Sequence, residues 1–423
     1  MIRAIKKVLK WSGILLLVYL VLVLMVFGWQ MFYGSIRDAD ADLVDQSMSP
    51  AVTRIIEYVR EIVAANRIPI YQRDAHAKPH GCVRAVFEVP ELAKPYRYGL
   101  FANPGRYEAW VRFSNGTVPS LPDTKKDARG MAIKVMGVTG PQLLDPRLSG
   151  NTQDFLMINS PNFFVRRIDE YVELERQSAN NTPFRYFFAD GSLNPLHWKL
   201  RQLYLGLTTR KTALSSPLSD QYFSMSAYSL GPHKIKFSAK ACDVIKPEGI
   251  DRSNPNFLRT ALKSVLREND ACFQFMVQLR DDDARMPVED TTVRWSEKIS
   301  PFAPVARLLI PQQFFDTPAQ NDMCENLAFN PWHGTEPHRP LGKINELRRD
   351  LYSHTAAFRR GRNGIALQEP LSWCDSLPSL CPPQPVDRPV SEPGSEPVLV
   401  PGPASVREPV SVPGQAGNGA GSE

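Results

Sequence analysis

The sequence predicts a mixed α+β fold that follows a single transmembrane helix. Residues 11–33 contain no charged side chain. Short strand-like segments separated by Gly, Pro and Asn occupy residues 80–140, and helical periodicity recurs on both sides of them. With 423 residues, of which 43% are hydrophobic and 22% charged, the chain is long and apolar enough to fill a large core.

The apolar run from Trp11 to Tyr33 is 23 residues long, and about 20 helical residues cross the core of a bilayer. Trp11, Trp29 and Tyr33 lie near its ends, where aromatic rings favour the membrane interface. Several Lys and Arg precede the run and several Asp follow it. Lys and Arg that flank a membrane helix favour its cytoplasmic side. We therefore expect a single-pass protein of the bacterial inner membrane, with the N-terminus in the cytoplasm and the main domain in the periplasm.

A cleaved signal peptide is the alternative for this run. The small-residue triplet Ala39-Asp40-Ala41 follows it and would supply a cleavage site. However, the triplet lies in an acidic stretch, and the apolar run exceeds the roughly 7–15 residues of a usual signal core. A membrane anchor over residues 11–33 is therefore the preferred interpretation.

Periodicity predicts the order of the remaining elements. Apolar residues recur at helical spacing within residues 36–65, and helices are also expected at 162–178, 195–208 and from Leu341 to about Arg360. Strands are expected at Val83–Val89, Ala109–Phe113, Gly130–Met136, 221–230, 233–241 and 271–279.

The composition divides the chain into three parts: a basic segment and anchor at 1–35, a main domain at 36–365, and a Pro-rich tail at 366–423. Residues 382–423 are rich in Pro, Ser, Glu, Val and Gly and cannot bury enough apolar surface to fold. Cys374 and Cys381 precede that stretch, and the sequence leaves open whether they form a disulfide.

Charge and cysteine spacing exclude two classes of function. The formal net charge is +6, but Lys and Arg are scattered, which argues against a nucleic-acid partner. The six cysteines form no CxxC pair, which argues against a metal site built from cysteines.

Five blocks of sequence carry the chemistry: Arg73–Gly81 (RDAHAKPHG), Val111–Ser114 (VRFS), Asp127–Lys134 (DARGMAIK), Asp154–Phe164 (DFLMINSPNFF) and Arg348–Tyr352 (RRDLY). In this order and at these separations they resemble the haem catalases. Weaker agreement lies at Tyr228–Phe237, Pro304–Ile310 and Cys324–Pro331, so the resemblance covers about residues 66–362.

The resemblance implies a closed antiparallel β-barrel around a buried haem b, wrapped by helices. It also implies a catalase- or peroxidase-type enzyme that takes hydrogen peroxide or an organic or lipid hydroperoxide and protects the cell envelope against oxidative stress. A homo-oligomer is left open. Two alternatives remain: a fatty-acid hydroperoxide isomerase or lyase similar to the allene oxide synthases, and a haem-binding or sensing protein without turnover.

Tyr352 matches the tyrosine that binds the iron in this family. Tyrosine binds iron only as phenolate, whereas a free phenol has a pKa of about 10. Arg348 precedes Tyr352 by four residues, so on a helix the two side chains share a face and the cation stabilises the phenolate. A tyrosinate ligand is typical of catalase.

His76 matches the family's catalytic base, and Ser114 matches the hydroxyl that fixes its tautomer. A neutral imidazole suits the transfer of a proton from one peroxide oxygen to the other. Zinc is a rival interpretation, because His76 and His80 are spaced i, i+4. That spacing needs a helix, and Pro79 and Gly81 argue against one.

The remaining expected haem contacts are arginines and aromatic residues. By the resemblance, Arg73, Arg112 and Arg359 bind the two propionates, and Arg359 lies two helical turns after Tyr352. The resemblance also places apolar or aromatic haem contacts at Phe163, Phe164 and Tyr171.

The sequence departs from the family pattern where peroxide binds. The family has two asparagines before the T/S-P pair, and the first orients peroxide; here the first position is Ile158 and only the second, Asn159, remains. Asn159 is retained as a candidate catalytic residue. Ala75 also replaces a bulkier valine before His76. Both changes predict a more apolar pocket.

Overall fold

The first half of the chain forms four antiparallel strands in succession: β1 (Pro79–Val89), β2 (Gly105–Asn115), β3 (Arg129–Met136) and β4 (Thr152–Ile158). The structure is a computed structural model that describes residues 2–36, 49–67, 70–145, 149–366 and 369–381. Because side chains alternate along a strand, the expected site residues Arg112 and Ser114 share one face of β2. In the register, Ser114 lies opposite Gly130 of β3.

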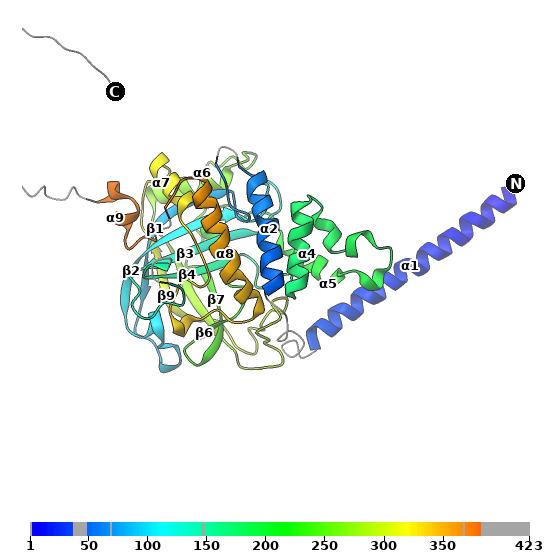
Figure 1. Ribbon diagram of the computed structural model, residues 1–423, viewed down its shortest axis with the longest axis horizontal. Helices are drawn as coiled ribbons and strands as arrows, with labels where there is room; N and C mark the ends of the chain where they lie inside the picture. Colours follow the sequence, from blue (N-terminus) through cyan, green and yellow to red (C-terminus); the bar gives the residue numbers. More distant parts are fainter. Residues whose placement is uncertain (1, 37–48, 68–69, 146–148, 367–368, 382–423) are drawn as a thin grey trace, which may run out of the picture. The chain divides into compact units, whose positions relative to one another are not determined.

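The second half supplies β5 (Gln221–Phe223), β6 (Tyr228–Leu230), β7 (His233–Ala241), β8 (Ala271–Leu279) and β9 (Ala303–Ile310). Strand β9 pairs with β1, and β5 pairs with both β4 and β7. These pairings close β1–β5 and β7–β9 into an eight-stranded antiparallel barrel, to which β6 adds a hairpin (Figure 1). The predicted closed barrel is confirmed.

Aromatic rings fill the interior of the barrel. Phe155 packs against Phe87, Phe237 and Phe275, with ring centroids 5.8, 5.2 and 4.6 Å away. A barrel of this size is only wide enough for side chains or one small ligand. Because its interior is packed, any larger group must bind on the outer face, between the strands and the helices that cover them.

Three helices form that cover: α2 (Ser49–Ala65), α4 (Ile168–Ala179) and α8 (Lys343–Arg362). Their apolar faces meet in one cluster that includes Ile55, Val59, Val172, Leu347 and Leu351. The predicted helices at 36–65 and 341–360 are therefore present, although residues 37–48 lie outside the described part.

Other helices lie around the barrel. They are α5 (Leu200–Thr209), α6 (Phe257–Glu268), α7 (Pro318–Asn326) and the short α9 (Trp373–Ser376). Single 3₁₀ turns are η1 (Lys94–Tyr96), η2 (Gly99–Phe101), η3 (Pro183–Tyr186), η4 (Ala189–Gly191), η5 (Pro195–His197), η6 (Pro217–Ser219), η7 (Glu336–His338) and η8 (Pro378–Leu380). Helices α6 and α7 were not predicted from the sequence.

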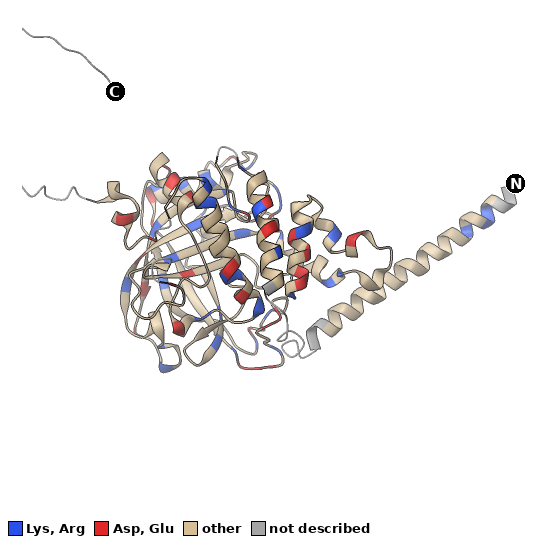
Figure 2. Cartoon of the chain, in the orientation of Figure 1, with Lys and Arg blue, Asp and Glu red and all other residues tan. Residues whose placement is uncertain are grey.

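Helix α1 (Ile2–Ile36) contains the predicted anchor. Its stretch from Ile5 to Tyr33 has a mean hydropathy of 2.5 and is long and apolar enough to cross a membrane. Most of its large apolar side chains are exposed, and Figure 2 shows its basic residues gathered near the N-terminus. A signal sequence would meet the same test of length and composition.

The folded part extends past the predicted domain boundary at residue 365. Glu369 is buried, the indole of Trp373 donates to the carbonyl of Ala109 at 3.0 Å, and Trp110 donates to Ser376 Oγ at 2.9 Å. These contacts attach the chain as far as α9 to the barrel strand β2. The predicted tail at 382–423 lies outside the described residues.

Disulfides link parts of the domain that are far apart in sequence. Cys82 of β1 is bonded to Cys324 of α7, and Cys242 to Cys272. Cys374 and Cys381 are also disulfide-bonded. Six cysteines allow fifteen pairings, so spacing alone could not identify the first two bonds.

Candidate functional site

A cavity that opens to solvent lies on the outer face of β2–β4 beneath α8. Seven residues predicted from the sequence line it: Arg73, His76, Arg112, Ser114, Arg348, Tyr352 and Arg359. The loop before β1, strand β2 and helix α8 bring these distant positions together.

His76 is held in an unusual backbone conformation. Its φ is +56°, a region that residues other than Gly rarely adopt. Its amide donates to the carbonyl of Gly116 at 3.1 Å, and its own carbonyl accepts from Arg112 Nη2 at 2.8 Å. Nδ1 lies 3.0 Å from Ser114 Oγ, as the resemblance implied, so Nε2 is left to face a substrate.

Gly130 leaves the room that His76 needs. A Cβ built on Gly130 would lie 2.4 Å from His76 Nδ1 and 2.8 Å from Ser114 Oγ. The imidazole therefore rests directly on the backbone of β3, and a larger residue there would displace the ring from its hydrogen bond.

If His76 is the catalytic base of a peroxide-processing site, as the sequence predicts, Gly130→Ala is expected to reduce turnover by roughly 10²-fold, because a shift of about 1 Å in a catalytic group costs about that much. The measurement is kcat/KM for peroxide in the two proteins. Gly137→Ala is the control, since a Cβ there meets nothing within 4 Å, although its φ of +71° adds local strain. Equal loss in both variants would contradict a specific role for the Gly130 contact.

The environment of His76 keeps its ring neutral. Burial, followed by repulsion from Arg112 and Arg73, lowers the pKa of His76 to about 4. A base with a lowered pKa is deprotonated, and therefore able to accept a proton, at every pH above that value.

The acid limb of the kcat/KM profile is consequently expected near pH 4, with a plateau above about pH 5. A free imidazole would instead titrate near 6.5. The check is a pH series of initial rates, with tertiary structure followed by near-UV circular dichroism at each pH. A limb near 6.5 with intact structure would contradict the assignment of His76 as the base.

Arg348 and Tyr352 meet on one face of α8. Arg348 Nη2 donates to the phenol oxygen of Tyr352 at 3.4 Å, and the guanidinium carbon lies 5.1 Å from the centre of the ring. Asn345 Oδ1 accepts from Arg348 at 3.0 Å and fixes it. Burial opposes the charge of Arg348, but attraction to Tyr352 and Tyr228 outweighs it and raises the pKa of Arg348. A cation stays beside the phenol, as an anionic ligand requires.

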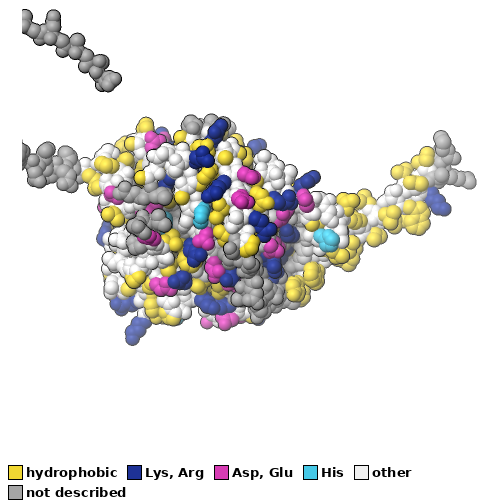
Figure 3. All heavy atoms as spheres, in the orientation of Figure 1, with side chains coloured by type: hydrophobic (Ala, Val, Ile, Leu, Met, Phe, Trp, Pro, Cys, Tyr) yellow, Lys and Arg dark blue, Asp and Glu magenta, His cyan; other side chains and the backbone are white. Residues whose placement is uncertain are grey.

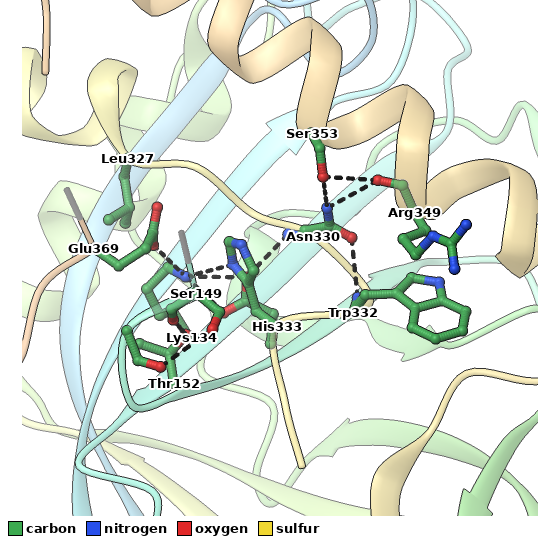
Figure 4. Close-up of polar contacts among 12 residues, drawn as sticks. Lys134, Ser149, Thr152, Leu327, Asn330, Trp332, His333, Arg349, Ser353 and Glu369 are labelled. Atoms are coloured by element: carbon green, nitrogen blue, oxygen red, sulfur yellow. Dashed lines mark hydrogen bonds and ion pairs between the residues drawn. The ribbon is translucent and has the colours of Figure 1, made fainter. Parts of the chain in front are cut away.

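A polar network fixes α8 against the barrel (Figure 4). Asn330 donates to the carbonyl of Arg349 at 3.3 Å and to Ser353 Oγ at 3.0 Å, on either side of Tyr352. Beneath it, the fully buried Lys134 pairs with Asp154 and with Glu369, each at 2.8 Å. The network therefore ties the helix that carries Tyr352 to the strand next to His76.

Three arginines, of which Arg112 and Arg359 are buried, converge at one part of the cavity. Arg73, Arg112 and Arg359 lie 3.8, 3.9 and 3.5 Å from carboxylate oxygens of Glu325. Burial and mutual repulsion lower the pKa values of Arg112 and Arg359 to about 9, so both remain charged at neutral pH. With one carboxylate among three guanidinium groups, the cluster keeps a net charge of +2.

That excess charge fits a dianionic group. Arg73 Nε, Arg112 Nε and Arg359 Nη2 are buried without a hydrogen-bond partner in the described part of the chain. Unpaired buried donors are costly, so a bound anion would stabilise them. The two propionates of haem b supply two negative charges. The donor set, together with the phenol of Tyr352, therefore fits a haem.

Glu325 and Asp74 were not identified from the sequence. Glu325 lies in the last turn of α7 and contacts the arginines, and the adjacent Cys324 is bonded to Cys82 of β1. Asp74 lines the cavity, and burial raises its pKa. Asp74 could have been predicted as a cavity residue from the sequence, because it lies between Arg73 and His76 in one motif.

The structure places Asn159 outside the set of described residues that line the cavity. Its Oδ1 accepts from the amide of Arg129 at 2.8 Å and its Nδ2 donates to Asp220 at 2.9 Å. Ile158 lines the cavity instead, because successive side chains at the end of β4 point to opposite faces. We therefore do not retain Asn159 as a residue that contacts substrate.

Phe163 and Phe164 pack beside the site. Their ring centroids are 4.9 Å apart, and Phe163 lies 5.8 Å from Tyr171. Within the described chain, none of the three is part of the cavity lining. His80, the second histidine of the zinc alternative, is buried in β1 with its Nδ1 3.9 Å from Asp123.

Solved structures that match this fold include catalases. A fungal catalase and a bacterial catalase each match with a TM-score of 0.54 and 18% identity, covering 71% and 72% of this chain. Catalase A from Saccharomyces cerevisiae matches with a TM-score of 0.54 and 19% identity over 72% of the chain. The match covers 61%, 60% and 65% of those three chains, less than two thirds of each. No protein family model and no curated protein matches.

The chain thus has a catalase-like fold: a closed antiparallel barrel with a helix-covered cavity on its outer face. The fold expected from the five sequence blocks is the one observed. Sequence identities of 18–19% establish the fold and not the activity.

Proposed function

We propose that this chain is a membrane-anchored, haem-dependent enzyme that processes peroxides. The observation that carries the proposal is the convergence of His76, the Arg348–Tyr352 pair and the arginine cluster on one cavity of a catalase-like fold. Each is a part that haem peroxide chemistry needs, and the sequence supplies them from segments that are far apart.

Each of these residues has a separate role in the proposed activity. The phenolate of Tyr352 would hold the iron, stabilised by Arg348, and Arg73, Arg112 and Arg359 would bind the propionates. Bound haem would supply the oxidation and reduction of peroxide. His76 accepts a proton at Nε2 from one peroxide oxygen and returns it to the other, while Ser114 holds Nδ1 and fixes the tautomer.

The test is an absorption spectrum of the purified protein, followed by oxygen-electrode and peroxidase assays. A haem spectrum with peroxide consumption supports the proposal. Haem without any turnover would favour a binding or sensing protein, and the absence of haem after expression with excess haem would refute the proposed function.

A fatty-acid hydroperoxide isomerase or lyase is the second candidate. Ile158, Leu156 and Ala132 give part of the cavity an apolar wall that suits an alkyl chain. Consumption of a lipid hydroperoxide without oxygen release and without a reductant would favour this activity.

We also propose that α1 anchors the protein in a bacterial inner membrane, with the domain in the periplasm. Basic residues before the apolar stretch support this orientation. The disulfides support it too, because such bonds persist in oxidising compartments.

Protease added to intact spheroplasts is expected to digest the domain. Protection in intact spheroplasts, with digestion only after lysis, would reverse the proposed topology. A cytoplasmic marker protein that survives the treatment is the control for an intact membrane.

A further inference from the structure

Exposed apolar side chains are concentrated in one segment of the domain, residues 183–209, which contains η3, η4, η5 and α5. They are Phe184, Leu193, Leu196, Tyr204 and Leu207, which are 53, 83, 65, 46 and 53% exposed. In the rest of the described domain, such side chains occur singly. Single apolar residues on a surface are ordinary, whereas a cluster marks a surface that contacts a partner or a membrane.

The 183–209 segment contacts α1 along the apolar part of that helix. The Tyr19 hydroxyl donates to the carbonyl of Leu193 at 2.9 Å. Gln30 donates to the carbonyl of Trp198 at 2.7 Å and accepts from the amide of Arg201 at 3.1 Å. The rings of Tyr19 and Trp198 also meet edge to face, with centroids 6.2 Å apart.

These contacts satisfy polar groups that a lipid environment would leave without partners. Gln30 and Tyr19 are polar side chains inside the apolar stretch of α1, and an unpaired polar group in hydrocarbon is unfavourable. Both bond to main-chain groups of the segment. If α1 spans the membrane, the 183–209 segment that bonds to Tyr19 and Gln30 must lie beside it within the bilayer.

The spacing of the contacts gives a depth. Tyr19 and Gln30 are 11 residues apart, which corresponds to about 16 Å along a helix with a rise of 1.5 Å per residue. The hydrocarbon core is about 30 Å thick. The segment therefore follows α1 through about half of the core, and Leu193, its most exposed apolar residue, lies at the deeper contact.

Two of the three cations of the segment, Lys199 and Arg201, turn toward the domain, whereas Arg185 is exposed and pairs with Asp190 at 3.5 Å. Arg201 donates to the carbonyl of Thr292 at 3.0 Å, and Lys199 Nζ lies 4.1 Å from the centre of the Tyr186 ring. Long basic side chains at a membrane surface place their charge away from lipid in this manner.

From these contacts we propose that the 183–209 segment is inserted into the outer half of the bilayer, where lipid acyl chains cover its exposed apolar side chains. The inference rests on the proposed membrane anchor. In space-filling representation, hydrophobic side chains continue along α1 (Figure 3).

The inserted segment is joined to the wall of the cavity. Thr209 Oγ1 lies 3.3 Å from Ser160 Oγ, and Lys211, just after α5, donates to the carbonyl of Asn159 at 2.5 Å. Asn159 and Ser160 directly follow Ile158, which lines the cavity. The site therefore lies next to an element that contacts lipid, which favours a peroxide carried on an acyl chain.

The test is photo-crosslinking of the full chain in vesicles of phosphatidylethanolamine and phosphatidylglycerol. Benzoylphenylalanine replaces Leu193, Leu196 or Leu207 in separate variants, Leu16 as the probe of the anchor, and Phe314 as the control. Phe314 is 78% exposed, close to the 83% of Leu193, and lies in the loop after β9. Circular dichroism checks that each variant is folded.

We expect phospholipid adducts, detected by mass spectrometry, at Leu16 and at all three segment positions, at a yield at least about tenfold above that at Phe314. Adducts at Leu16 alone would overturn the insertion of the segment and leave the anchor standing. No adduct at any position would overturn both the anchor and the insertion.

Discussion

Tyr352→Phe is expected to abolish haem retention or to shift the Soret and charge-transfer bands strongly. Phenylalanine keeps the ring that packs among α2, α4 and α8 but removes the oxygen that accepts from Arg348. Without a phenolate, the iron of the proposed haem would lose its protein ligand, and the charge of Arg348 would be left buried without the phenol oxygen beside it.

The measurement is the absorption spectrum and haem content after gel filtration. Tyr58→Phe is the matched control, because Tyr58 packs against the same helix cluster. It should retain haem with an unchanged spectrum. An unchanged spectrum in Tyr352→Phe would refute the assignment of Tyr352 as the ligand, whatever the activity.

Ile158→Asn is expected to raise kcat/KM for hydrogen peroxide by roughly 10²–10³-fold, the usual effect of one preorganised polar group in an active site. Ile158 is 6% exposed and lines the cavity, where its side chain neither donates nor accepts a hydrogen bond. The same change should lower kcat/KM for cumene hydroperoxide or a fatty-acid hydroperoxide, because an alkyl group loses apolar surface on which to pack.

Both rates are compared in wild type, Ile158→Asn and Ile158→Val, the last of which keeps the position apolar and should leave the preference for substrate unchanged. Oxygen evolution at catalase level in wild type, with no gain in the asparagine variant, would contradict the role given to Ile158. The amide of Asn159 does not offer an alternative in this structure, since both of its ends are already bonded.

Much of the site could be predicted because its residues lie in short motifs. The alternation of a strand puts Arg112 and Ser114 on one face of β2, and the four-residue spacing puts Arg348 and Tyr352 on one face of α8. Both relations depend only on neighbours within the same element. In the structure, Ser114 accordingly bonds to His76 in the cavity, and Arg348 bonds to Tyr352.

The same alternation decides between Ile158 and Asn159. Neighbouring residues at a strand end face opposite sides, so only one of them can line the cavity, and the motif alone does not say which. Pairing of Ile158 with Gly130 in the β3–β4 ladder settles the question by fixing the face of β4 that meets the cavity.

The sequence by itself determined the apolar helix, most of the strands and helices other than α6 and α7, and the motif residues, because each depends on periodicity or on neighbours a few positions away. Only the tertiary structure decided that Glu325 joins the three arginines, that Cys82 bonds to Cys324, and that the 183–209 segment contacts α1. Those contacts join positions separated by many residues, and the packing of whole elements, rather than any local preference of the chain, sets the distances between them.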